Sequence, residues 1–283
     1  MAFVIESRFP RMVRRARRIS DSMDTAGKHA VFYGRAIASI PRALVHYRTE
    51  VIRLIAEISM GTGALAVIGG TVVIVGFLTL FSGGTIAVQG YSSLGNIGVE
   101  ALTGFFSAFL NVRIAAPVIS GIGLAATIGA GSTAQLGAMR VSEEIDALEV
   151  MAIRPVPYLI GTRVLAGMIA IVPLYALAVI ASFFAARFAT VVIYGQSAGV
   201  YDHYFSTFLI PSDILWSFAQ AILMALAVMM IHTYYGYFAA GGPVGVGVAV
   251  GNAVRASLVA VVTVTLLMSL AIYGTSGNFN LSG

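Results

Sequence analysis

A run of 42 residues without a charged side chain, from Ile58 to Val99, most constrains how this chain can fold. A helix rises 1.5 Å per residue, so such a run extends about 60 Å, twice the ~30 Å hydrocarbon core of a bilayer. Across the whole chain, 58% of the 283 residues are hydrophobic and 10% are charged, whereas soluble domains carry about 25% charged residues. Water cannot solvate such a sequence, and we expect a polytopic membrane protein.

Five membrane-spanning helices are predicted, and with them an all-α fold. The first span is expected at about 63–90 and is followed by a polar turn at 91–98. The second, at about 99–137, is longer than one crossing requires, so we expect it to tilt or to extend beyond the bilayer. The other three spans are expected at about 159–185, 213–238 and 254–274.

Positive charge is concentrated near the N-terminus, where eleven of the seventeen Lys and Arg residues precede residue 54. With five spans, this segment lies on the same side of the membrane as the loops 139–157 and 239–253, while Arg187 is alone on the other side. Cytoplasmic loops are enriched in Lys and Arg. We therefore predict a plasma (inner) membrane protein with a cytoplasmic N-terminus and an outer-side C-terminus. No nucleic-acid motif accompanies the basic residues, so a membrane surface is favoured over nucleic acid.

The N-terminal 60 residues divide into two parts. Residues 1–30 are polar and basic, and we expect a partly disordered cytoplasmic arm. Residues 31–60 are expected to form an amphipathic helix that lies in the membrane interface. Its apolar positions are Ile37, Ile40, Leu44, Val51, Ile55 and Ile58, against Arg35, Arg42, Arg48 and Arg53. An ordinary soluble amphipathic helix is the alternative, but direct attachment to a span favours the interfacial one.

The sequence contains few residues or motifs that could support catalysis. It has no cysteine, its four histidines show no metal-ligand spacing, and no nucleotide-binding loop is present. We expect neither a metal site nor ATP hydrolysis by this chain, and no cofactor bound to it. The pair Asp202-His203 could serve acid–base chemistry, but without a nucleophile a solvated loop is the better interpretation.

Charge within the spans is scarce, and Arg113 is the clearest instance. It could meet a lipid headgroup, or it could be a structural charge that pairs or reaches the interface. A single cation without a carboxylate relay argues against the alternative function, an ion-coupled secondary transporter of lipid or another hydrophobic substrate. Nearby, Phe105 and Phe109 could line a lipid-accepting cavity or could simply pack.

The polar segment 139–157 interrupts the apolar spans. Four of the twelve acidic residues lie within seven positions of it: Glu143, Glu144, Asp146 and Glu149. Apolar residues at helical spacing accompany them, namely Ile145, Leu148, Val150, Met151 and Ile153, and Pro155 and Pro157 end the helix. Apolar anchors flanked by acidic residues are typical of a helix that docks in a groove of a partner. A surface helix without a partner is the alternative.

The chain resembles the MlaE/YrbE permease family, the membrane subunits of ABC-type lipid transporters that work with MCE proteins. The resemblance covers about residues 55–275 and is carried by Gly129–Gly137, Met139-Arg140, Glu143–Ala152, Pro155 and Arg163–Gly167. The basic arm, Asn96–Glu100, Tyr235–Tyr237 and Gly241–Gly247 are similar to B-type YrbE subunits of actinobacterial Mce systems.

The resemblance implies an interfacial N-terminal helix, a permease domain at 61–275 with five spans, and an outer-side tail at 276–283. It implies that residues 141–152 form a cytoplasmic coupling helix between the second and third spans, which docks on an ABC ATPase dimer that holds ATP and Mg. The implied coupling residues are Met139, Arg140, Glu143, Glu144, Ile145, Asp146, Leu148, Glu149 and Met151. A second permease, most often a paralogue, and outer-side MCE proteins complete the expected lipid importer.

Departures from the family pattern concern charge in the second span. Members often have Arg-Glu-Leu-Gly-Pro; here Arg113 and Pro117 match, but Ile114 replaces the Glu. Thr127 stands where an Arg is common and Gln135 where a Glu is frequent. The implied lipid pathway comprises Phe105, Phe109, Arg113, Pro117 and Gln135. The lost charges favour an asymmetric pair in which the partner permease supplies them.

Overall fold

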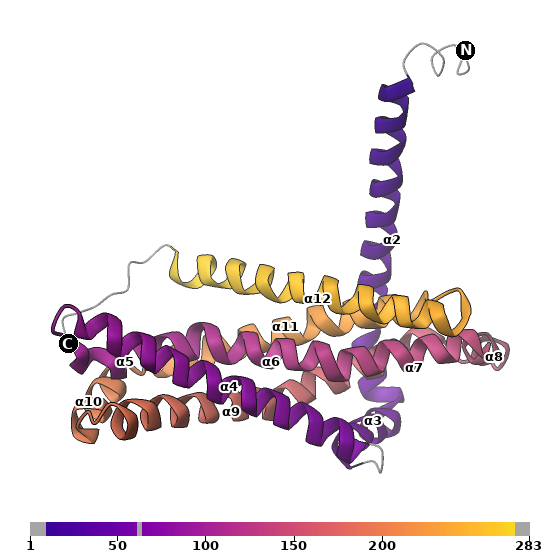
Figure 1. The fold of residues 1–283 in the computed structure, drawn as a ribbon. Coiled ribbons are helices and arrows are strands. Elements are labelled where there is room, and N and C mark those ends of the chain that lie inside the picture. The colour runs from indigo at the N-terminus through magenta and orange to yellow at the C-terminus, as the bar shows by residue number, and fades with distance from the viewer. Residues whose placement is uncertain (1–9, 61–63, 275–283) are drawn as a thin grey trace.

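The computed structural model describes residues 10–60 and 64–274, and in these ranges the chain forms helices joined by short turns, without a strand (Figure 1). The predicted all-α fold is confirmed. The first nine residues of the expected arm and the expected tail at 276–283 lie outside the described residues. Two helices precede the bundle: α2 (Pro10–His46) and α3 (Arg48–Met60). The helix α2 includes residues 10–30, which we had expected to be partly disordered.

Within the described residues, five helical segments are long and apolar enough to cross a membrane: Gly70–Gly95, Glu100–Val141, Val156–Ile193, Pro211–Tyr237 and Gly242–Ile272. The first and last belong to α4 (Ala64–Gly95) and α12 (Gly242–Tyr273), and the fourth is α11 (Pro211–Tyr237). The second contains η1 (Glu100–Leu102), α5 (Thr103–Leu110), η2 (Asn111–Ala115), α6 (Ala116–Leu124), η3 (Ala125–Gly129) and α7 (Ala130–Val141). The third contains η4 (Val156–Gly161), α9 (Thr162–Phe188) and η5 (Ala189–Ile193).

The number of spans was predicted correctly, but two connections differ from the prediction. The last span begins at Gly242 and not near 254, because the glycine-rich segment that suggested a loop is helical. Gly241 and Gly242 have φ of +90° and +69°, and Pro243 follows, so the glycines form the turn and the proline starts the helix. The long loop after the third span contains an unpredicted helix, α10 (Ala198–Phe208).

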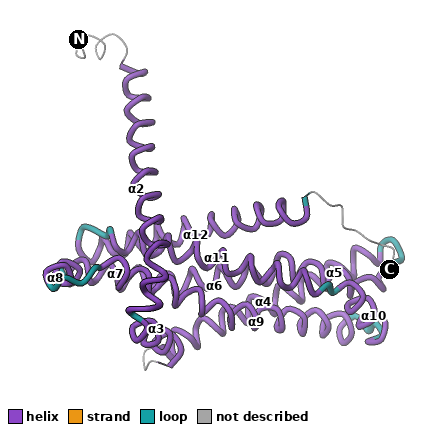
Figure 2. The backbone as a smooth tube through the Cα atoms, turned by 180° about the vertical axis from the view of Figure 1, so that it is seen from behind, coloured by secondary structure: helices purple, strands orange, loops and turns teal. Residues whose placement is uncertain are grey.

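The connections gather at two ends of the bundle (Figures 1 and 2). One end carries α2, α3, the short helix α8 (Glu144–Val150) and the turn before α12. The other carries α10, the turn after α4 and the described end of α12. This division matches the loop arrangement from which the cytoplasmic N-terminus was predicted, and that orientation itself stays a prediction.

The helix α2 runs across the long axes of the spans, and α8 lies farther out at the same end (Figures 1 and 2). Phe32, Ala36 and Ala43 are buried against the bundle, whereas Ile37 and Leu44 are 50% and 52% exposed. A helix that lies across the spans and exposes apolar side chains suits a membrane interface. The direction of α2 and its exposed apolar side chains therefore fit the interfacial location, which stays a prediction.

Close helix packing through small residues holds the bundle together. A Cβ atom added at Gly83 of α4 would lie 2.4 Å from the backbone oxygen of Ser182 in α9, and one at Gly167 of α9 would lie 2.3 Å from Cγ of Met229 in α11. Lipid tails do not drive helices together hydrophobically, so such close approach provides the packing energy. The glycines thus fix how near α4 and α11 lie to α9.

We predict that Gly83→Ala lowers the thermal stability of the detergent-solubilised chain. The added methyl group would push α4 away from the α9 backbone, at a cost of about 1–3 kcal/mol, as for overpacked cores. Gly84→Ala is the matched control, because a Cβ there meets nothing within 4 Å. The unfolding midpoint should fall for Gly83→Ala and stay or rise slightly for Gly84→Ala. Equal midpoints would contradict the close contact.

Candidate functional site

The helix α8 is held at the end of the second span by local polar contacts. Arg140 Nη1 donates to Asp146 Oδ1 at 2.6 Å, and Ser142 Oγ donates to Glu144 Oε1 at 2.9 Å. Glu143 has a left-handed φ of +61°, which turns the chain sharply between α7 and α8. The seven residues Glu144–Val150 therefore form a separate helix and do not continue α7.

One apolar side chain, Ile145, anchors α8 on the bundle. It is fully buried and packs with Leu136 of α7 and Leu159 at the start of the third span, against partly buried Met139, Leu148, Tyr158 and Tyr237. We had predicted that Ile145 faces a partner, and the structure contradicts this because its side chain is covered by its own chain. Ile145 instead joins α8 mechanically to both adjoining spans.

Apart from Leu148, which is partly buried beside Ile145, the other predicted coupling residues of α8 face outward. Glu143, Glu144, Asp146 and Glu149 are exposed, and Met151 is 61% exposed. Val150, which we had not included among the coupling residues, is 88% exposed. We call this set the α8 surface: Glu143, Glu144, Asp146, Glu149, Val150 and Met151. It combines two apolar side chains with four acidic ones at the tip of the bundle.

At the opposite end of the bundle, Arg113 forms an ion pair with Asp213 at the start of α11. Its Nε and Nη2 atoms donate to Asp213 Oδ2 at 3.0 and 2.7 Å, and the two side chains are 11% and 16% exposed. The guanidinium carbon also lies 4.1 Å from the centre of the Phe109 ring. Of the two roles considered for Arg113, structural pairing is the one seen in the structure.

A break in the backbone hydrogen bonding lies beside this ion pair. The residues Asn111–Ala115 form a π-helical turn, in which the N–H of Ala116 donates to the carbonyl of Asn111. The next such bond would join Val112 to residue 117, but Pro117 has no N–H. The Ser217 hydroxyl of α11 donates to the Val112 carbonyl instead, at 2.5 Å. The second and fourth spans are therefore joined twice within a few residues.

The five residues predicted for a lipid pathway do not gather in one place. The centre of the Phe105 ring lies 5.6 Å from that of Phe109 and 4.7 Å from that of Phe208. Because Arg113 lies over the Phe109 ring, the aromatic residues and Arg113 form one cluster. Pro117 is buried inside the bundle, and Gln135 is exposed on α7, toward the other end. The structure thus supports a local cluster near the end of the bundle that carries α10 and no continuous path through all five.

A buried polar connection that sequence analysis missed joins three spans. His232 of α11 is fully buried; its Nδ1 lies 2.8 Å from the Thr133 hydroxyl of α7, and its Nε2 lies 3.2 Å from the Ser257 hydroxyl of α12. A polar side chain in an apolar span needs such partners. The available signal was a histidine within a span, but its two partners are distant in sequence.

In the pair Asp202-His203, the aspartate forms an ion pair with Arg187. Arg187 donates two hydrogen bonds to the Asp202 carboxylate, at 2.8 and 2.9 Å, and this contact keeps the pKa of Asp202 below its usual value. Within the described part of the chain, no group of three or more His, Cys, Asp and Glu residues is arranged to hold a metal ion. Asp202 is half-exposed and ion-paired, which fits the interpretation of the pair as solvated, but the two residues lie in α10 and not in a loop.

Five apolar helices, with an exposed short helix between the second and third, define a multi-pass α-helical membrane protein. The family model described as permease MlaE matches residues 60–271, and the chain belongs to this family. The finer resemblance to B-type YrbE subunits stays a prediction.

Several curated proteins are similar over part of their length. The chain is 28% identical over 166 residues to the protein TRIGALACTOSYLDIACYLGLYCEROL 1, chloroplastic, of Arabidopsis thaliana, covering 59% of this chain and 47% of the relative. It is 30% identical to a probable ABC transporter permease protein of Rickettsia felis, with 56% and 58% covered, and 24% identical to one of Synechocystis sp., with 59% and 63% covered. The chain thus spans about half the length of the curated relatives it matches.

Replacing Asp213 by Asn is predicted to lower the free energy of unfolding by about 3 kcal/mol, because it removes the carboxylate that compensates a largely buried guanidinium. Asp202→Asn is the matched control, since it breaks an Arg–Asp pair whose side chains are 51% and 50% exposed. Chemical unfolding in detergent should show a much larger loss for Asp213→Asn. Similar losses in both variants would show that the buried ion pair contributes no more to the free energy of unfolding than the exposed one.

Proposed function

We propose that this chain is the transmembrane permease subunit of an ABC-type lipid importer that works with MCE proteins. Membership in the MlaE permease family supports a permease, and relatives named ABC transporter permease support an ABC system. The Arabidopsis relative carries the name of a glycolipid, which supports a lipid substrate. In this proposal the chain is not itself catalytic, and a separate ATPase dimer holds ATP and Mg.

The observation that best supports coupling to such an ATPase is the α8 surface. Val150 and Met151 are 88% and 61% exposed at the tip of the bundle, next to four exposed acidic residues. Apolar side chains that fill a groove, with acidic ones that pair with cations at its rim, suit helix-in-groove docking. Residues 141–152 act as the coupling helix in this proposal.

Movement of α8 would reach the spans through Ile145. This side chain packs on Leu136 and Leu159, so a displaced α8 pulls on the end of the second span and on the start of the third. From α7, the contacts of His232 with Thr133 and Ser257 extend to α11 and α12. Closure of the ATPase dimer on ATP would in this way reshape a cavity between two paired permeases and let a lipid pass.

The second permease is proposed to be a paralogue that supplies the charged residues missing here. Ile114 and Gln135 are exposed on the second span and Thr127 is partly exposed, so a neighbouring subunit or a lipid can reach these positions. MCE proteins are proposed at the end that carries α10, on the outer side of the inner membrane. The N-terminus and the α8 surface then lie in the cytoplasm, as the distribution of Lys and Arg indicates.

We predict that Val150→Asp combined with Met151→Asp abolishes ATPase binding. Removing a central apolar contact of an interface costs at least about 2 kcal/mol, so co-purification of the ATPase with the tagged permease should fall more than about tenfold. ATP-dependent lipid transfer into proteoliposomes should fall with it. Both side chains are exposed, so the fold should be unaffected.

The matched control is Ile97→Asp, which changes a 73% exposed apolar side chain in the turn after α4, and this turn lies at the opposite end of the bundle (Figure 1). It should leave the amount of co-purified ATPase unchanged. If Val150→Asp/Met151→Asp retains the ATPase as well as the control does, the coupling role of α8 is wrong. Transfer that continues without any ATPase would contradict the ABC mechanism itself.

A further inference from the structure

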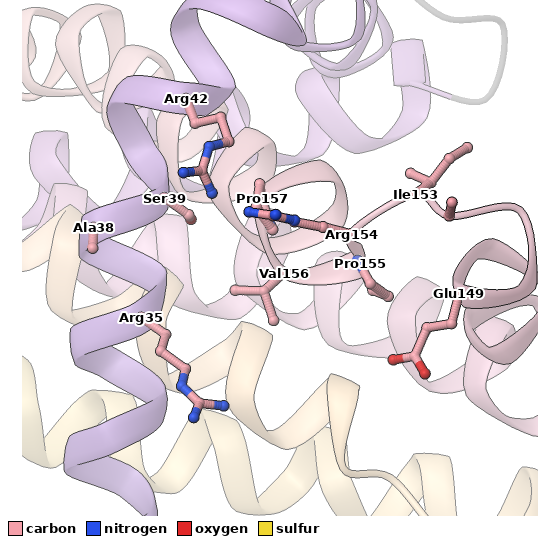
Figure 3. A pocket seen from close by; sticks show the side chains of 11 residues that line it. Arg35, Ala38, Ser39, Arg42, Glu149, Ile153, Arg154, Pro155, Val156 and Pro157 are labelled. Carbon is pink, nitrogen blue, oxygen red and sulfur yellow. The ribbon is translucent and has the colours of Figure 1, made fainter.

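A basic cavity of about 540 Å³ lies between α2 and the segment that links α8 to the third span (Figure 3). We call it the arginine cavity. It is lined by Arg35, Ala38, Ser39 and Arg42 of α2 and by Glu149, Ala152, Ile153, Arg154, Pro155, Val156 and Pro157. Arg35 and Arg42 are seven positions apart, so both project from one face of α2. They point toward the segment that carries Arg154 (Figure 3).

The arginine cavity carries an excess of positive charge. Three guanidinium groups and one carboxylate, that of Glu149, give it a formal charge of +2. Among the residues whose side chains the structure describes, Arg35, Arg42 and Arg154 have no hydrogen-bonded or ion-paired partner, unlike Arg113 and Arg140. Like charges directed into one cavity repel each other unless an anion lies between them. Guanidinium groups match the oxygen geometry of phosphate particularly well.

The start of the third span adds to this preference. Pro155, Val156 and Pro157 form one wall of the arginine cavity, and the span continues from Val156 to Ile193 as one helical segment. The positive end of the helix dipole therefore lies at the cavity, where it favours an anion. This contribution supplements that of the three arginines, which is the larger.

The surroundings of the arginine cavity suit a membrane lipid. Beside Arg35 and Arg42 on α2, Val31 and Val45 are 56% and 71% exposed, whereas Ile37 and Leu44 lie on the opposite face of the helix. The helix runs across the spans, and α8 lies farther out at the same end of the bundle (Figures 1 and 2). An amphiphile with an anionic head and apolar chains could place its head in the cavity and its chains beside Val31 and Val45.

We propose that the arginine cavity binds the phosphate group of an anionic phospholipid of the adjoining leaflet. Arg35 and Arg42 hold the phosphate from α2, and Arg154 holds it from the link that follows α8. The bound lipid thus clamps α2 to this link and restricts how α8 can move. The effect on coupling rests on the proposed function, whereas lipid binding to the cavity does not.

The test measures the lipids that the purified chain retains. The chain is purified in micelles with equal amounts of phosphatidylglycerol and phosphatidylcholine, and bound lipids are counted by native mass spectrometry. Arg42→Gln and Arg154→Gln should each reduce retained phosphatidylglycerol about tenfold, the value of one charge-assisted hydrogen bond. Arg48→Gln is the matched control, since Arg48 is an exposed arginine outside the cavity and begins α3, which lies at the same end of the bundle (Figure 1).

A gain-of-binding variant guards against misfolding as an explanation. Glu149→Gln removes the carboxylate that repels the phosphate and should raise retained phosphatidylglycerol about threefold. A misfolded variant would not bind more lipid. Phosphatidylcholine retention should stay the same in all four variants, because it lacks the net charge that the cavity selects.

Three results would overturn the proposal. An equal loss in Arg48→Gln would show a general attraction of basic residues to the membrane surface and no defined site. Displacement of phosphatidylglycerol by inorganic phosphate would show a site for the free anion. Unchanged lipid retention in Arg42→Gln and Arg154→Gln, with loss of ATPase co-purification, would assign the arginines to a protein partner. Because lipid retention is measured on the permease alone, its failure is distinguishable from a failure of α8 docking.

Discussion

Hydrocarbon provides no partner for a charge or a free backbone carbonyl, and this constraint decides how the spans are joined. Arg113 can be largely buried because Asp213 accepts its hydrogen bonds and the Phe109 ring lies beside its guanidinium group. The Val112 carbonyl, which Pro117 leaves without a backbone donor, is met by Ser217. In both places the partner comes from α11. The polar requirements of the second span therefore help to fix its position against the fourth, and glycine contacts set the distances between α9 and its neighbours.

The same constraint distinguishes the buried polar contacts between the spans from the polar surface at the end of the bundle that a partner can reach. Within the bundle, His232 joins α7, α11 and α12 through hydroxyl groups. At the end of the bundle water can solvate polar groups, so α8 needs only one buried side chain, Ile145, to remain attached. Its acidic side chains and Val150 then face outward, while Leu148 is partly buried beside Ile145. A short helix that is attached by one buried side chain and exposes an acidic and apolar surface fits the proposed coupling function.

The helix α2 contacts three different environments. It buries Phe32, Ala36 and Ala43 on the bundle, exposes apolar side chains beside them and directs Arg35 and Arg42 into the arginine cavity. Water, acyl chains and protein each meet a different face. Such a helix is stable only where these three environments meet, at the surface of a bilayer. The proposed phosphate site uses that boundary and places a lipid between α2 and the link to α8.

The sequence alone determined the all-α class, the five spans and the exposed acidic helix, because long uncharged segments and a local cluster of acidic residues are readable without any partner. It misplaced the start of α12, since glycines in a span look like a loop, and it did not reveal α10. Only the tertiary structure decided that Ile145 is an internal anchor, that Arg113 pairs with Asp213 and that Arg35, Arg42 and Arg154 share a cavity. These facts depend on residues far apart in the chain, and helical periodicity shows which face a side chain lies on but not what that face meets.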